Sequence, residues 1–363
     1  MLSVRNRIFA AIAAAAILLV ANTPARAQAA GQTGPPPSPG KWGRMAPLPE
    51  KSEEFTFGDV NGKIYLFGGL PVGNKPPLGL VQEYDPATDK WTQKKNMPLA
   101  THHAAIAAYN GKLYLFGGQA QLEPAGPTQI PINNTWEYDP ANDSWKALAP
   151  MPTARTAAVA AEVGGKIYVL GGASVHPGQK IVSLGPTVPH RSLDVNEVYD
   201  VATNTWATKM TMPTARNHAA AGVVNGKIYV IGGRVGSSVI TTSSNTNVVE
   251  VYDPATDLWG AAGLRMPTSR SGMGWATYKG KIYVVGGQVY DREVFGAIRA
   301  VEGYDPATNT WAILPNMFTA RHGVNVAIIG DKLYAIGGHV QAAGTGGEAA
   351  NTDANEVYEF ADR

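Results

Sequence analysis

The side chains best suited to chemistry are glutamates and histidines at two adjacent positions in related segments of the chain. They are Glu53, Glu54, His102, His103, His218 and His322. Histidine titrates near neutral pH and works with carboxylates in general acid–base catalysis. This chemistry makes Glu54, His103 and His218 the candidate catalytic residues.

Two other interpretations of these residues stay open. A metal site needs the same residue types, but this spacing matches no recognised ligand motif. Exposed Glu and His are common in proteins, so the sequence alone favours solvated residues at the rim of the molecule. On alternating strand positions, only one member of Glu53-Glu54 and one of His102-His103 should face a common centre.

Four arginines stand at the neighbouring position of the same segments, where the first two segments have Ser52 and Thr101 instead. The arginines are Arg155, Arg216, Arg270 and Arg321. An arc of guanidinium groups could hold a carboxylate or a phosphate by bidentate hydrogen bonds. The candidate ligand-binding residues are therefore these four together with Glu54, His103, His218 and His322.

A second pattern gives the arginines a structural role. Every segment with the arginine has a glutamate further on, and the two segments without it have Gln82 and Trp136 there; the glutamates are Glu197, Glu250, Glu302 and Glu356. Because the two charges are present together in four segments and absent together in the other two, the pattern predicts a buried or half-buried Arg–Glu pair that fixes the scaffold. We favour this interpretation over ligand binding.

The elements that position these residues belong to a repeat, written most fully from Met212 to Gly233. Its Lys-Ile-Tyr run ends in Gly-Gly six times, at intervals of 49 to 61 residues, with second glycines Gly69, Gly118, Gly172, Gly233, Gly287 and Gly338. Repeats of this length indicate a β-propeller or a similar array. Each copy predicts four strands: a small apolar strand, the Lys-Ile-Tyr strand, a strand that ends in Tyr-Asp and a strand that opens with Trp.

The sixth copy lacks its Trp strand, and a matching segment, residues 41–45, occurs near the N-terminus. We therefore expect this segment to complete the last blade and close the ring, which removes two exposed sheet edges. The fold class expected is all-β, a six-bladed propeller. The blades should cover about 52–97, 101–151, 155–212, 216–266, 270–317, and 321–360 with 41–46.

Gly-Gly, a later Tyr and a Trp about six residues beyond it resemble the kelch repeat, across residues 41–360. The resemblance implies a kelch-type propeller in which the loops before strand one and between strands two and three share one face. The second set is long and dissimilar here, covering residues 70–79, 119–133, 173–194, 234–247, 288–299 and 339–354. Variable loops on a rigid scaffold carry function. The expected function is an exported binding module that recognises a protein or a glycan through this long-loop face and the channel mouth.

The resemblance to the kelch repeat also implies two enzyme classes that are known on kelch-type propellers. Galactose oxidase chemistry needs a Cys cross-linked to a Tyr, and the absence of Cys excludes it. The second class is the exported bacterial sialic acid mutarotases, which this chain also resembles. This resemblance implies the alternative function, a mutarotase or epimerase that acts on an anionic sugar such as sialic acid. Apolar residues in the fifth long loop favour the binding module instead, namely Val289, Tyr290, Val294 and Phe295. We expect neither a metal nor another cofactor.

The N-terminus has the pattern of an export signal. Arg5 and Arg7 precede an apolar run from Ile8 to Ala21, and Ala25-Arg26-Ala27 fits a cleavage site. We expect a signal peptide over 1–27, a Pro/Gly-rich linker over 28–40, a propeller over 41–363 and a bacterial protein that is periplasmic or secreted. Without three signal arginines, 27 of the 30 Lys and Arg remain against 28 acidic residues, a net charge of −1. That charge gives no reason to expect nucleic acid or a membrane as partner.

Overall fold

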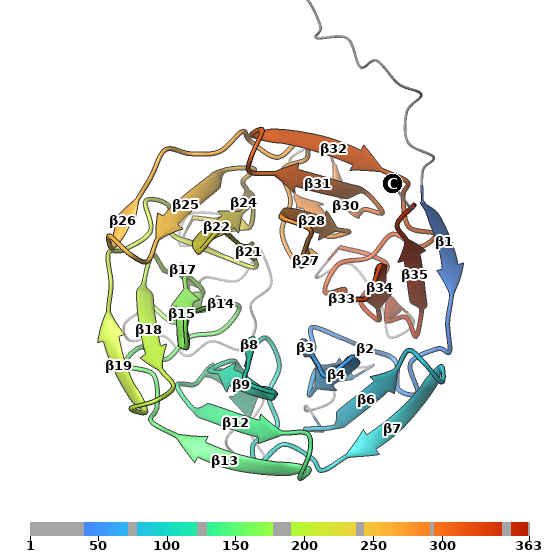
Figure 1. Cartoon of the computed structure of the whole chain (residues 1–363), viewed down its shortest axis with the longest axis horizontal. Helices are drawn as coiled ribbons and strands as arrows, with labels where there is room; N and C mark the ends of the chain where they lie inside the picture. The colour runs from blue at the N-terminus through green and yellow to red at the C-terminus, as the bar shows by residue number, and fades with distance from the viewer. Residues whose placement is uncertain are drawn as a thin grey trace, which may run out of the picture. The chain divides into compact units, whose positions relative to one another are not determined.

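The computed structural model describes residues 40–71, 78–121, 129–176, 190–236, 243–290, 294–342 and 350–361. The expected signal peptide and nearly all of the expected linker lie outside these residues, as do parts of the six long loops. The described residues contain six four-stranded antiparallel sheets, arranged as blades around a central axis (Figure 1). Within the same residues, no helix has the length and apolarity needed to cross a bilayer.

Each blade takes its strands in sequence order from the axis outward. Blade 1 has β3 (Thr56–Val60), β4 (Lys63–Phe67), β6 (Val81–Asp85) and β7 (Lys90–Lys94), and blade 2 has β8 (Ala105–Tyr109), β9 (Lys112–Phe116), β12 (Thr135–Asp139) and β13 (Ser144–Leu148). Blade 3 has β14 (Val159–Val163), β15 (Lys166–Leu170), β18 (Asn196–Asp200) and β19 (Thr205–Thr208), and blade 4 has β21 (Ala220–Val224), β22 (Lys227–Ile231), β25 (Val249–Asp253) and β26 (Leu258–Trp259). Blade 5 has β27 (Gly274–Tyr278), β28 (Lys281–Val285), β31 (Val301–Asp305) and β32 (Thr310–Leu314).

The sixth blade joins the two ends of the propeller. It consists of β33 (Asn325–Ile329), β34 (Lys332–Ile336), β35 (Asn355–Glu359) and β1 (Lys41–Arg44). The strand β1 pairs antiparallel with β35, from Lys41 opposite Glu359 to Arg44 opposite Glu356. The predicted fold and its closure by an N-terminal strand are therefore confirmed.

The tryptophans of the outer strands tie each blade to the one before it. Every such indole Nε1 donates a hydrogen bond to a backbone carbonyl of the preceding blade, at 2.8 to 3.1 Å; the donors are Trp42, Trp91, Trp145, Trp206, Trp259 and Trp311. The buried tyrosines of the third strands act within their own blade. Tyr84 Oη, for example, donates to Asp89 Oδ1 at 2.7 Å, and the same oxygen accepts from the backbone amide of Ala46. Both aromatic columns thus stabilise the scaffold.

Shorter ladders lie outside the blades, between the loops that precede the first strands and those that follow the second strands. Two of them make this connection: β2 (Ser52–Glu53) pairs with β5 (Leu70–Pro71), and β20 (Arg216–Asn217) pairs with β23 (Arg234–Val235), which also pairs with β24 (Ser244–Asn245). Three other ladders lie within the loop between the second and third strands of a blade: β10 (Gln119–Gln121) with β11 (Gln129–Pro131), β16 (Ala173–Ser174) with β17 (Arg191–Ser192), and β29 (Gln288–Tyr290) with β30 (Phe295–Ala297). These ladders hold the candidate residues at one end of the channel.

Candidate functional site at the channel mouth

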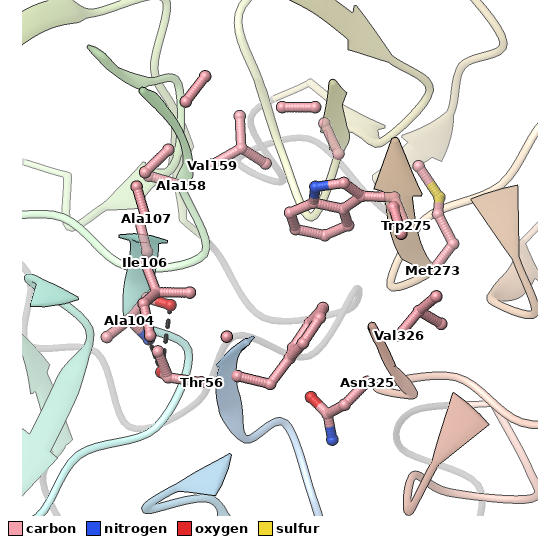
Figure 2. A pocket seen from close by; sticks show the side chains of 18 of the residues that line it. Thr56, Ala104, Ile106, Ala107, Ala158, Val159, Met273, Trp275, Asn325 and Val326 are labelled. Atoms are coloured by element: carbon pink, nitrogen blue, oxygen red, sulfur yellow. Dashed lines mark hydrogen bonds between the residues drawn. The ribbon is translucent and has the colours of Figure 1, made fainter. Parts of the chain in front are cut away.

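The first strands of the blades surround a cavity of about 440 Å³. Figure 2 shows its apolar wall, to which Ile106, Val159, Trp275 and Val326 contribute from different blades. Across this channel, the rings of Phe57 and Trp275 meet edge to face with their centroids 5.9 Å apart. Because blades 1 and 5 are not neighbours, this contact narrows the channel and leaves the polar residues grouped at its mouth.

A ring of six equivalent residues forms this mouth, and all six have a left-handed backbone conformation with φ between 51° and 61°: Glu54, His103, Ala157, His218, Gly272 and Gly323. All six line the cavity. Five backbone hydrogen bonds of 2.8 to 3.2 Å link each amide to the carbonyl of the equivalent residue in the preceding blade, from His103 to Gly323. The ring fixes where each of its side chains begins.

This conformation corrects one sequence expectation. The aligned positions do not lie in the first strands of the blades, which begin later, and strand alternation does not separate neighbouring side chains there. Glu53 Oε2 and Glu54 Oε1 both approach His322 Nε2, at 3.5 and 3.8 Å. A left-handed residue breaks the alternation of an extended chain, so both neighbours face the mouth.

The structure brings the three candidate catalytic residues together. One ring nitrogen each from His103 and His218 and one carboxylate oxygen from Glu54 lie within 4.8 Å of one another. His103 Nε2 is 3.3 Å from Glu54 Oε2, and the two imidazole rings have centroids 5.1 Å apart. We call this set the mouth triad. Each member comes from a different blade, since the residues lie in blades 1, 2 and 4.

Neighbouring side chains orient the two histidines of the mouth triad. His218 Nδ1 donates to Asn217 Oδ1. Gln129 Oε1 accepts from His102 Nε2 at 2.6 Å, so His102 Nδ1 accepts the hydrogen bond from His103 Nδ1. In both triad histidines, Nδ1 is therefore the donor to a neighbour, and Nε2 remains for the centre of the triad.

Burial controls the protonation of this region. It lowers the pKa of His218 well below its ordinary value, helped by Arg234 and His103. Burial would raise the pKa of Glu54, but the facing imidazoles of His103, His218 and His322 hold it well below its ordinary value. The mouth triad thus combines an ionised carboxylate with a neutral imidazole at His218.

The other residues of the mouth are also removed from water. His102 is 3% exposed and His322 is 1% exposed, so the prediction that these histidines are solvated is wrong. Burial lowers the pKa of His102 to about 3 and that of His322 to about 4. Burial, and then the neighbouring Glu54, raise the pKa of Glu53 to about 8. The sequence could not show this burial, because it depends on how the blades converge.

The four arginines belong to the scaffold instead. Their side chains are fully buried and pair with the predicted glutamates, at 3.0 Å for Arg155–Glu197, 2.9 Å for Arg270–Glu302 and 3.4 Å for Arg321–Glu356, and also in Arg216–Glu250. Their remaining hydrogen bonds go mostly to backbone carbonyls, as from Arg216 Nη1 to Gly232 and Val248. The predicted pairing is confirmed. Fully buried side chains cannot reach a ligand at the mouth, so the structure replaces the ligand-binding interpretation of Arg155, Arg216, Arg270 and Arg321.

Sequence reasoning missed a further column of residues at the mouth, although the repeat contained its signal. The residue directly after each Gly-Gly pairs with the residue before the ring position, as Arg234 does with Asn217 and His339 with His322. The full column is Leu70, Gln119, Ala173, Arg234, Gln288 and His339. Alignment of the repeats at this position would have added Arg234 and His339 to the candidates.

Comparisons with known proteins agree with this architecture. The family model described as the KLHDC2/KLHL20/DRC7 Kelch-repeats domain matches residues 149–338, and the Kelch motif matches residues 59–98 and 100–152. Kelch-like protein terF of Aspergillus terreus is 30% identical over 213 residues, which are 57% of this chain and 43% of that protein. Beta-scruin of Limulus polyphemus is 29% identical over 244 residues, 66% of this chain and 25% of that protein. The chain therefore spans less than half the length of either relative.

Proposed function

Because this chain belongs to the kelch-repeat family, we propose that it is a binding module that recognises a partner protein on its long-loop face. The observation that carries the proposal is the β29–β30 ladder of blade 5, where Val294 is 53% exposed and Phe295 is 46% exposed. Large apolar side chains held at such a position lose contact with water when a partner covers them. Of the four apolar residues expected there, these two are exposed, Val289 is half-buried and Tyr290 is buried.

The exposed residues are anchored to the mouth. The Phe295 ring packs edge to face on Tyr290, with centroids 4.3 Å apart, and the guanidinium of Arg234 lies over the Tyr290 ring at 5.6 Å. Leu78 and Val340 are exposed in the corresponding loops of blades 1 and 6. Blades 5, 6 and 1 are consecutive around the ring, so one partner can contact all three loops. Aliphatic side chains such as Val294 favour a protein partner over a glycan, since sugars offer mainly hydroxyl groups.

Affinity capture from an extract of the source organism tests this proposal. The bait proteins are the wild type, Phe295→Ser and the control Ile313→Ser, which removes a 77% exposed side chain from the outer strand β32. We expect one protein, enriched by the wild type and by Ile313→Ser, to be lost with Phe295→Ser. Capture of the same proteins by all three baits, or capture of glycans alone, would contradict a protein site at Phe295.

The convergence of Glu54, His103 and His218 supports a second candidate, a mutarotase or epimerase for an anionic sugar. A carboxylate and imidazoles can exchange protons with the oxygens of a sugar ring. The arginines expected to hold the sugar carboxylate lie in the scaffold, but Arg234 lies beside the triad, close to His218 and Glu54. NMR measurement of anomer equilibration with sialic acid tests this candidate. A wild-type rate above that of His218→Gly would support it, and equal rates would exclude it.

The N-terminal pattern supports a location outside the cytoplasm, in the periplasm or the medium. Cleavage after Ala27 would leave Gln28 as the first residue. Intact mass spectrometry of protein from the periplasmic fraction and from the medium measures this terminus directly. A chain that starts at Gln28 in either fraction is the expected result, and an uncleaved chain found with the cytosol would contradict export.

A further inference from the structure

We propose that Glu54, His103 and His218 bind one divalent transition-metal ion at the channel mouth. The first observation is the geometry of the three side chains. Two imidazoles and one carboxylate, from three different blades, have ligand atoms within 4.8 Å of one another. A set of two histidines and one carboxylate is a known ligand set for zinc and for other first-row metals. It leaves further coordination positions for water or a ligand that enters the mouth.

The hydrogen bonds around the triad present the correct atoms. Metal-binding histidines commonly donate their second ring N–H to a neighbouring acceptor, which fixes the tautomer and the ring orientation. Here His218 Nδ1 donates to Asn217, and His103 Nδ1 donates to His102, which Gln129 holds in turn. His103 Nε2 then faces Glu54 Oε2 at 3.3 Å, a separation at which a cation can contact both atoms.

Backbone strain marks the same three positions. Residues with a side chain rarely adopt φ near +55°, whereas glycine does so freely, and the ring has glycine in blades 5 and 6. Strained residues cluster at functional sites. Ala157 occupies the ring position of blade 3 without any ligand atom. Its presence shows that the scaffold tolerates a β-carbon there and supplies an internal control.

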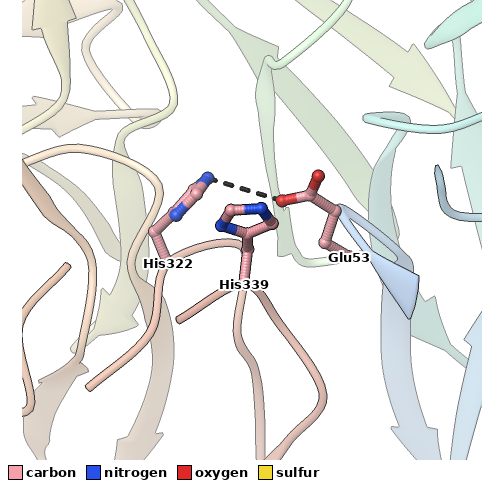
Figure 3. Close-up of side chains that lie close together, drawn as sticks. All are labelled: Glu53, His322 and His339. Atoms are coloured by element: carbon pink, nitrogen blue, oxygen red, sulfur yellow. Dashed lines mark ion pairs between the residues drawn. The ribbon is translucent and has the colours of Figure 1, made fainter. Parts of the chain in front are cut away.

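A second group of residues lies beside the triad but is less suited to a metal. Figure 3 shows His322 and His339 facing Glu53, with the His322–Glu53 contact at 3.5 Å. His339 Nδ1 lies 3.0 Å from the backbone carbonyl oxygen of Gln341, to which it can donate, and 3.2 Å from the backbone amide of Gln341, from which it can accept. Among the described residues His322 Nδ1 has no hydrogen-bond partner, whereas Nδ1 of each triad histidine donates to a neighbouring side chain. We therefore assign the ion to the mouth triad.

We expected no metal from the sequence because Glu54, His103 and His218 follow no local ligand motif. Blades 1, 2 and 4 contribute one ligand each, and the residues are separated by 49 positions from Glu54 to His103 and by 115 from His103 to His218. The three ligand residues come together because the ring at the channel mouth places the equivalent residues of all six blades side by side. In the sequence, three of the six repeats have Glu or His at the position where the repeats of blades 5 and 6 have glycine.

Zinc titration of purified, chelator-treated protein tests the proposal. Calorimetry measures stoichiometry and affinity for the wild type, His103→Gly, His218→Gly and the control Ala157→Gly. Glycine is the residue that blades 5 and 6 use at this position, so these variants retain the backbone conformation. We expect one Zn²⁺ per chain in the wild type and in Ala157→Gly, and an affinity at least 100-fold lower in each histidine variant.

Cobalt provides an independent readout, because the visible absorption of Co²⁺ changes with the number and geometry of its ligands. We expect a Co²⁺ spectrum for the wild type that Zn²⁺ abolishes and that Glu54→Gln weakens. Circular dichroism of every variant should match the wild type. Equal zinc affinities for the wild type, His103→Gly and His218→Gly would overturn the proposal and assign the centre of the triad to a proton on His103.

Discussion

The Glu54 carboxylate lies directly against Gly323, its neighbour in the ring at the channel mouth. A β-carbon on Gly323 would come within 3.0 Å of Glu54 Cδ and 3.1 Å of Glu54 Oε1. A β-carbon on Gly272, the ring residue of the preceding blade, would meet only ordinary contacts of 3.5 Å or more. The two glycines have similar φ values of 57° and 61°, so they differ in their neighbours and not in their conformation.

This difference predicts separate effects for two matched substitutions. Both Gly323→Ala and Gly272→Ala should lower stability by about 1 to 2 kcal/mol, because alanine is strained in the left-handed region. Gly323→Ala should also displace the Glu54 carboxylate and weaken Zn²⁺ binding at least 10-fold, which Gly272→Ala should not. Thermal denaturation and calorimetry measure the two effects. Equal zinc affinities in the two variants would show that Glu54 is not a ligand.

Asn217 should matter through its contact with His218. Loss of a side chain that orients a metal-binding histidine commonly lowers metal affinity 10- to 100-fold. We expect Asn217→Ala to lower zinc affinity by this factor. Ser271 holds the equivalent position in blade 5, and its hydroxyl has no hydrogen-bond partner in the described part of the chain, so Ser271→Ala is the control. Calorimetry in which both variants bind like the wild type would contradict the orienting role.

The Arg–Glu pairs predict a large loss of stability on substitution. Arg216 and Glu250 are both buried, and Arg216→Ala leaves the carboxylate without its partner, which costs about 3 to 5 kcal/mol in such pairs. Arg265 lies in the same blade but is exposed, and Arg265→Ala should cost less than about 0.5 kcal/mol. Urea denaturation measures both values. A stability for Arg216→Ala close to that of the wild type would contradict its scaffold role.

The closure of the ring predicts opposite results for two truncations. Removal of residues 1–46 deletes β1 and exposes the edge of β35, and an unpaired edge promotes aggregation. Removal of residues 1–39 retains β1 and should leave a monodisperse protein. Light scattering and thermal denaturation distinguish the two. If the shorter chain stays soluble and melts like the longer one, β1 does not close the propeller.

The fold could be predicted because the same strand and turn pattern recurs in every repeat. The blades could be predicted from the repeated Trp, Tyr and Gly-Gly positions. Their closure could be predicted from the Trp42 segment near the N-terminus. The ion pair could be predicted because Arg216 and Glu250 occur in the same repeat. The mouth was less predictable. Strand alternation failed there because Glu54 and His103 have a left-handed backbone that their residue types do not signal. Burial of His322 depends on the meeting of blades 6 and 1, whose contacts at the mouth no single repeat encodes.

The central claim is that a partner protein binds the long-loop face at Phe295. Photo-cross-linking tests it most directly, with a benzophenone amino acid placed at position 295 or, as a control, at position 313 of the outer strand. We expect illumination in an extract to join one protein to position 295 and none to position 313. Absence of a protein adduct at position 295, or the same adducts at both positions, would contradict it.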